Sequence, residues 1–194
     1  MRNRLFLVLV LLAGCATAPK SMENIPLVWL PERHPTASVG AASEAFLKTK
    51  IKVVQMSDSR QNPKQIGENR EQTPARPVTT SDDVAAFVTD HFKALISGAG
   101  LTVVDSGESV ILKGDVQQFF VTETEQYVGD VRLRITATDT AGKTLWDGSA
   151  AGTSTRTGRS YRADNYYQSL SDALSEATTH LVDDPAFQAA VTRK

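Results

Sequence analysis

The chain has 194 residues, 21 basic and 22 acidic side chains, a formal net charge of −1 and a single cysteine. This length can bury the core of one domain but is short for two. The near balance of charges, without a strongly basic tract, argues against a nucleic-acid-binding protein. One cysteine cannot form a disulfide within the chain, so hydrophobic burial has to hold the fold together.

The first 14 residues have the features of a secretory signal. Arg2 and Arg4 precede an apolar run over residues 5–12, and small residues follow it. A membrane helix needs about 20 apolar residues, so this run is too short to cross a bilayer. We therefore expect residues 1–14 to be removed as a signal peptide.

The cysteine follows this run directly, in the sequence Leu12-Ala13-Gly14-Cys15. This motif resembles the lipobox of bacterial lipoproteins. The resemblance implies that acyl chains, palmitate among them, are attached at Cys15 and anchor the protein in a membrane. Residue 16 is Ala rather than Asp. In lipoproteins of enteric-type bacteria this implies sorting to the outer membrane, with the domain on its periplasmic face.

The mature chain begins with small and polar residues, and we expect residues 15–24 to be a flexible lipidated tether. Residues 25–194 are predicted to form a single α+β periplasmic domain. The apolar segment Ile25–Pro31 is bracketed by prolines, which favours a short edge strand or an extended arm. Residues 32–48 are predicted to be a loop with a helical turn near residues 43–47.

A strand is expected over residues 50–56, followed by Asp58, Ser59 and Arg60. The next segment, residues 61–77, is polar and contains several prolines. We expect it to be a long loop, and loops of this length are often functional or mobile.

The clearest helix is expected to begin at Thr80 or Ser81 and to end at Gly98 or Gly100, since its apolar residues recur every three or four positions. His91 lies at the edge of this apolar stripe. A packed histidine is favoured over a metal ligand there, because the other two histidines, His34 and His180, form no metal-binding spacing with it.

Strands are expected next over residues 101–104, 109–121, 127–139 and 143–156, and the last three form an antiparallel meander. Alternation places Val131, Leu133 and Ile135 on one face and Arg132 and Arg134 on the other, which is typical of a half-buried strand. In the preceding strand, four residues are expected to share a face: Val110, Leu112, Val116 and Phe120.

A helix beginning near Asp164 and a short one from Pro185 to Val191 complete the predicted elements. The order of elements predicts an α+β fold, a two-layer sandwich in which two helices cover one face of a mostly antiparallel sheet.

The chain resembles the YajG-type family of bacterial envelope lipoproteins. The resemblance rests on the lipobox, the proline-bounded apolar segment, the strand ending in Asp58-Ser59-Arg60, the segment with Ile66-Gly67, the helix ending at Gly100 and the meander. It spans most of the mature chain. It implies an envelope lipoprotein and points to no particular activity.

The sequence has no nucleophile elbow, phosphate-binding glycine loop, zinc-binding helix or Cys–His pair. Carboxylates at strand ends are explained by turns. We therefore expect a non-catalytic module without a cofactor. Two functions stay open: an accessory protein that binds an envelope protein partner through its sheet face or its long loop, or a direct binder of lipopolysaccharide, lipid or glycan.

Three arginines are candidate binding residues. An exposed row of Arg132, Arg134 and the nearby Arg156 on the solvent-facing side of the sheet would suit phosphorylated lipid headgroups. The alternative is that these arginines pair with Glu123 or Glu125 across strands.

A second candidate site combines Asp58 and Arg60 with the long loop. Ile66 and Gly67 would then act as a lid or docking element, and deletion of residues 61–77 should abolish partner binding without changing the melting temperature. The alternative is that Asp58 only stabilises a turn by accepting backbone hydrogen bonds.

Overall fold

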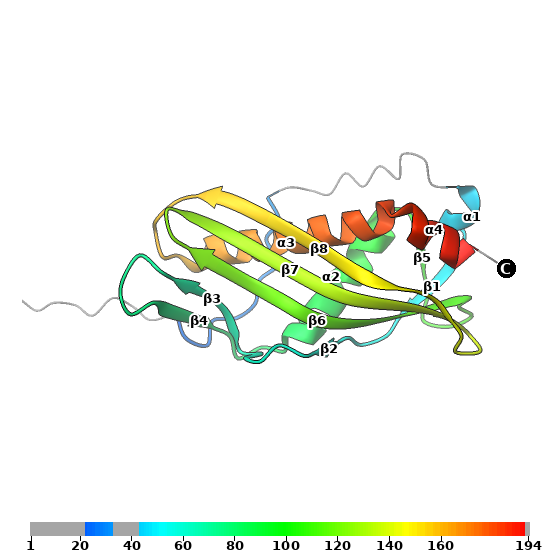
Figure 1. Cartoon of the computed structure of the whole chain (residues 1–194), viewed down its shortest axis with the longest axis horizontal. Coiled ribbons are helices and arrows are strands. Elements are labelled where there is room, and N and C mark those ends of the chain that lie inside the picture. The colour runs from blue at the N-terminus through cyan, green and yellow to red at the C-terminus, as the bar shows by residue number, and fades with distance from the viewer. Residues whose placement is uncertain (1–21, 33–42, 193–194) are drawn as a thin grey trace, which may run out of the picture.

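The computed structural model describes residues 22–32 and 43–192, and these form an eight-stranded mixed sheet with four helices (Figure 1). The expectations for the signal peptide, Cys15, His34 and residues 33–42 lie outside the described residues. The predicted α+β class is confirmed. None of the described helices has the length and apolarity that a membrane span requires.

The helices are α1 (Glu44–Leu47), α2 (Val84–Gly98), α3 (Ala163–Asp183) and α4 (Pro185–Thr192). The strands are β1 (Lys50–Val53), β2 (Ser57–Asp58), β3 (Gln65–Asn69), β4 (Arg76–Thr79), β5 (Thr102–Val103), β6 (Val110–Glu123), β7 (Gln126–Asp139) and β8 (Thr144–Thr157).

The meander β6–β7–β8 is antiparallel, as predicted, and each of its strands begins and ends within two residues of its predicted bounds. The predicted core side chains of β7 are fully buried. The prediction for Phe120 was wrong, because a bulge between Val116 and Gln118 shifts the alternation of β6 by one residue. Phe119 therefore enters the core, and Phe120 is only half-buried.

The other edge of β6 carries three short strands in succession. β1 pairs with residues 110–112, β2 with 115–116 and β3 with 121–123, and all three pairings are parallel. The sheet is therefore mixed, whereas the sequence predicted a mostly antiparallel one. Most paired residues do lie in the antiparallel meander, because its strands are so much longer.

The predicted loop over residues 61–77 was wrong. It contains β3 and the start of β4, which pair with each other in antiparallel fashion, and β3 also joins β6. Pro77 lies in β4 at the edge of the sheet, where a residue without an N–H costs no ladder hydrogen bond.

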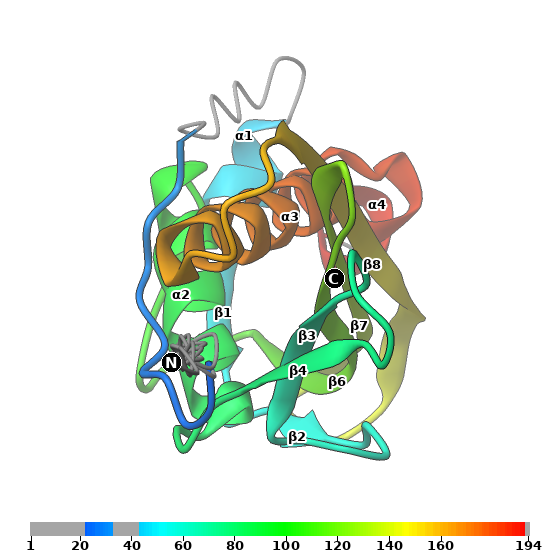
Figure 2. The same ribbon diagram turned by 90° about the vertical axis from the view of Figure 1, so that its left-hand side faces the viewer.

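Figure 2 shows α2 and α3 side by side on one side of the meander. α2 begins later than predicted, because the carboxylate of Asp83 accepts a hydrogen bond from the N–H of Ala86 and caps the helix. α3 approaches β8 very closely at Gly152. A Cβ atom there would lie 2.2 Å from the carbonyl oxygen of Ala173.

The segment Ile25–Pro31 forms an extended arm, one of the two predicted alternatives, beside α2 (Figure 2). The chain is attached to the domain before this arm, since Met22 pairs with Val78 of β4. The predicted flexible tether over residues 15–24 therefore extends too far at its C-terminal end.

Candidate binding surfaces

Arg60 and Asp58 form a buried ion pair. The guanidinium donates from Nε to Oδ1 of Asp58 at 2.9 Å and from one terminal nitrogen to Oδ2 at 2.7 Å. Its other N–H groups donate to the carbonyl oxygens of Pro63, Gln65 and Phe119. Because all five donors have acceptors within the domain, this arginine ties β2 and β3 to β6 and leaves no donor for a ligand.

Ile66 and Gly67 lie in the core. Ile66 has no exposed surface. A Cβ atom on Gly67 would lie 2.7 Å from both the ring of Tyr166 and the carbonyl oxygen of Val121. The structure therefore places these residues under α3 and not on a movable lid.

Arg132 and Arg134 do share the outer face of the meander, the face opposite the helices. Arg134 is paired with Asp147 of β8, which also accepts a hydrogen bond from Thr136. Arg132 is exposed and has no ion-pair or hydrogen-bond partner among the described residues. The residue opposite it on the edge strand β8 is Ala151, which has a small side chain.

Arg156 is not part of this group. Its side chain points to the helix side of the sheet, where it bonds Asn165 and Glu32. The predicted alternative, pairing of these arginines with Glu123 or Glu125, was also wrong, since Glu125 pairs with Arg159.

Glu123 is instead a buried carboxylate with its own donors. It accepts hydrogen bonds from the N–H of Tyr161 at 2.9 Å and from the hydroxyl of Tyr166 at 2.8 Å. Burial, together with the hydrogen bond to Glu123, raises the pKa of Tyr166 above its ordinary value. These two hydrogen bonds attach the turn before α3 and the first turn of α3 to the end of β6, so Glu123 has a structural role.

The outer edge of β8 is the longest unpaired strand edge in the described part of the chain. β8 has 14 residues and pairs only with β7. Two of its outward groups bond α3: the N–H of Thr153 donates to Glu176, and the carbonyl of Ala151 bonds His180 Nδ1 at 2.8 Å. By alternation, the odd-numbered residues present their backbone groups on this edge.

The remaining edge groups, on either side of these two contacts, have no partner among the described residues. Apart from Asp147, the odd-numbered side chains from residue 149 to residue 157 are small or β-branched, and the other charged residue of β8, Arg156, bonds on the helix side. Edge strands are usually protected by lysine, proline or a covering element, because unpaired backbone groups accept another strand. Ser149 and Thr155 lie in the two unprotected stretches.

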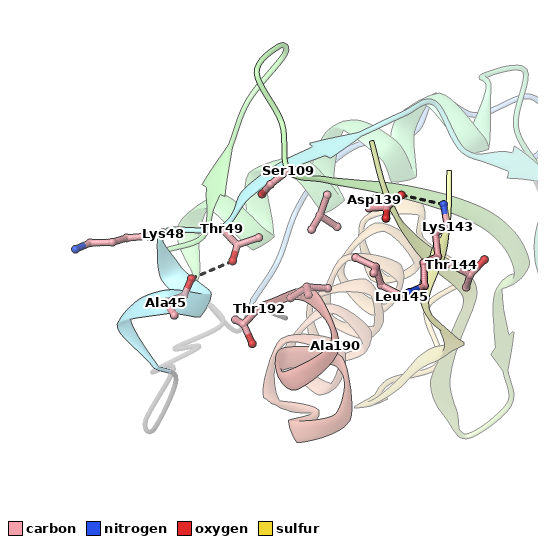
Figure 3. Close-up of a pocket in the computed structure, with 12 residues that line it drawn as sticks. Ala45, Lys48, Thr49, Ser109, Asp139, Lys143, Thr144, Leu145, Ala190 and Thr192 are labelled. Atoms are coloured by element: carbon pink, nitrogen blue, oxygen red, sulfur yellow. Dashed lines mark hydrogen bonds between the residues drawn. The ribbon is translucent and has the colours of Figure 1, made fainter. Parts of the chain in front are cut away.

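A cleft of about 880 Å³ lies at the end of the domain where α1 and α4 meet the β7–β8 hairpin (Figure 3). Thr49, Ser109 and Thr144 give it hydroxyl groups, and Val110, Leu145 and Val191 give it apolar surface. The amine of Lys48 points away from the cleft in Figure 3 and bonds Glu44. Strand β4, whose Val78 pairs with Met22, lies at the end of the domain opposite the cleft in Figure 1.

His91 packs against the arm, with ring centroids 4.3 Å from Trp29 and 4.4 Å from Phe87. Burial lowers the pKa of His91, and the charge of Asp90 opposes this shift. Within residues 22–32 and 43–192, no cluster of three or more His, Cys, Asp or Glu side chains is suited to hold a metal ion.

Sequence reasoning missed both the β8 edge and the cleft. The edge carried a readable signal, since residues 147–157 contain no lysine and no proline. The cleft could not be predicted from the sequence, because the residues that line it come from segments far apart in the chain, between residues 45 and 192.

The fold and these surfaces define a small α+β domain that presents an open sheet face and an open strand edge. The chain belongs to the Lipoprotein_16 family, described as uncharacterized lipoprotein, whose family model matches residues 35–192. The predicted resemblance to YajG-type lipoproteins is thereby confirmed. No curated protein matches the chain.

Two solved structures are similar in fold. A protein from Xanthomonas campestris is 14% identical, with a TM-score of 0.54, over 76% of this chain and 91% of that one. An uncharacterized protein is 8% identical, with a TM-score of 0.52, over 84% and 97%. A lipoprotein from Neisseria meningitidis matches at 14% identity over 58% and 88%, but with a TM-score of only 0.37. At these identities the matches concern the fold alone.

Proposed function

We propose that this protein is a lipoprotein anchored at Cys15 to the periplasmic face of the outer membrane, and that its domain is a non-catalytic module that binds an envelope protein. The observation that carries the binding proposal is the unprotected edge of β8. A partner segment that adds as a strand would pair with its free N–H and C=O groups.

The chemistry beside the edge indicates the kind of segment. Arg132 has no partner among the described residues and lies opposite the small residue Ala151 of β8, one strand in from the edge. An acidic side chain on the added strand would give it a charge-assisted hydrogen bond. The partner is therefore an extended protein segment with an acidic residue, and the binding requires no catalytic group or cofactor.

The anchor is tested by Cys15→Ser. Radiolabelled palmitate should mark the wild-type protein and not this variant, and the labelled protein should fractionate with outer membranes. Palmitate on Cys15→Ser would contradict lipidation at this residue. Fractionation with the inner membrane would contradict only the sorting inferred from Ala16.

The binding proposal is tested by photocrosslinking in cells from residue 149 on the edge. One envelope protein should be captured in high yield there, and none from residue 90, an exposed position on α2. Thr155→Pro should reduce the product from residue 149, because it removes an edge N–H of the same strand and hinders an added strand. Equal products from residues 149 and 90 would contradict the proposal.

The cleft supports a second candidate function, direct binding of a lipid or glycan. Its volume lies in the range of small-molecule sites, and its walls combine hydroxyl and apolar groups. A photoreactive residue at Leu145, which lines the cleft, would then give products that migrate with lipid or glycan. In that case, residue 149 should give none.

A further inference from the structure

The arm Ile25–Pro31 is apolar on both of its sides, although only one side packs on the domain. Ile25, Leu27 and Trp29 contact the core. The opposite side presents Pro26, Val28 and Leu30 to solvent, and Val28 and Leu30 are 40% and 37% exposed. An extended surface segment normally carries polar residues on its outer side, so the fold does not account for these three residues.

The arm also has few free backbone donors. Pro26 and Pro31 lack an N–H. The N–H of Ile25 donates to the carbonyl of Thr79, that of Leu27 to Asp82 Oδ2, and that of Leu30 to Ser171 Oγ. A strand partner needs free backbone groups, whereas an apolar environment penalises them. The arm is therefore suited to a lipid surface and poorly suited to pairing with a strand.

The position of the arm in the chain also favours contact with a lipid surface. Six residues separate Cys15 from Met22, the first described residue. The seven residue steps from Cys15 to Met22 span at most about 25 Å when fully extended. A lipid on Cys15 would hold the arm close to the bilayer, and such a tether makes even a weak second contact effective.

We propose that the outer side of the arm, formed by Pro26, Val28 and Leu30, rests in the interface of the membrane to which the protein is anchored. The inference depends on the proposed lipid anchor at Cys15. It gives the domain a fixed orientation, in which the arm faces the lipid and the outer face of the meander, on the side away from the helices, faces the periplasm.

The chain provides a matched pair of reporter positions. Val28 on the arm and Val128 on the outer face of β7 are both 40% exposed. The sequence has one cysteine, which the lipid consumes, so Val28→Cys and Val128→Cys each add a single free thiol. A nitroxide on each thiol reports whether its surroundings are lipid or water.

The test uses the full lipidated chain in vesicles of phosphatidylethanolamine and phosphatidylglycerol. At position 28, oxygen should collide with the nitroxide more often than a water-soluble nickel complex does, and at position 128 the order should reverse. Replacing phosphatidylglycerol with phosphatidylcholine should leave the result unchanged, because apolar contact and not charge carries the binding.

Water-like accessibility of the nitroxide at both positions, or equal lipid exposure at both, would overturn the proposal. It would also be overturned if the nitroxide at position 28 became immobilised only after envelope proteins were added, since this would assign the arm to a protein partner. The mass of the purified chain separates the two hypotheses. A chain without acyl groups contradicts the anchor, whereas an acylated chain with position 28 in water contradicts only the arm contact.

Discussion

The carboxylate of Asp58 and the guanidinium of Arg60 lie two residues apart and face each other through two parallel hydrogen bonds, with side chains only 13% and 6% exposed. An ion pair so deeply buried is costly to break, because the remaining charge keeps its desolvation penalty without its partner.

We therefore expect Asp58→Asn to lower the free energy of unfolding by about 3–5 kcal/mol. The matched control is Arg162→Gln, which breaks the exposed pair of Arg162 and Asp164, also two residues apart, and should cost less than about 1 kcal/mol. Urea unfolding measures both. Equal costs for the two variants would contradict the structural role of the buried pair.

The second prediction concerns β3. Ile66→Ala should cost about 2–5 kcal/mol, because it leaves a cavity where a fully buried side chain packs. Gln72→Ala, at the exposed tip between β3 and β4, should change stability by less than about 0.5 kcal/mol. Deletion of residues 61–77 should unfold the domain, contrary to the sequence-based expectation of an unchanged melting temperature.

The third prediction compares two glycines. Gly152→Ala should be strongly destabilising, since its Cβ would lie 2.2 Å from the carbonyl of Ala173 and 2.3 Å from the backbone nitrogen of Ala177. Gly98→Ala meets no atom within 4 Å at the end of α2 and should stabilise by up to about 1 kcal/mol. Thermal unfolding checks both. A tolerated Gly152→Ala would contradict the close approach of α3 to β8.

The fourth prediction concerns pH. Because burial lowers the pKa of His91, the unfolded chain binds its proton more readily than the folded one. This histidine therefore favours the folded state above pH 6.5, the unfolded value, and that contribution is lost as the pH falls below it.

His91→Gln removes this titration and should reduce the loss of melting temperature between pH 8 and pH 5. The difference between wild type and variant isolates this residue from the others that titrate. An identical pH dependence in the two proteins would show that the packed ring against Trp29 does not resist protonation.

The sequence predicted the meander closely because its strands are long and alternate with a period of two. The alternation of apolar residues at Val131, Leu133 and Ile135 predicts a buried face from the local sequence alone. The bulge after Val116 could not be read in this way, since residues 117 and 118 are both glutamine and give no signal of the added residue.

β3 was missed for a different reason. Its sequence, Gln65–Asn69, has one large apolar residue and a glycine, so its strand conformation is decided by the free edge of β6 and not by local preference. Arg60 was predicted as a candidate binding residue, and only the folded chain shows that its five donors are all bonded within the domain.

The attachment of β1, β2 and β3 to one edge of β6 has a consequence for how the domain forms. These strands pair with β6, which lies about 50 to 60 residues further along the chain. They therefore lack this pairing partner until β6 has been synthesised. The meander, by contrast, closes through two short local turns. During synthesis from the N-terminus, β1 to β3 should therefore be among the last strands to gain protection from hydrogen exchange, although they are made first.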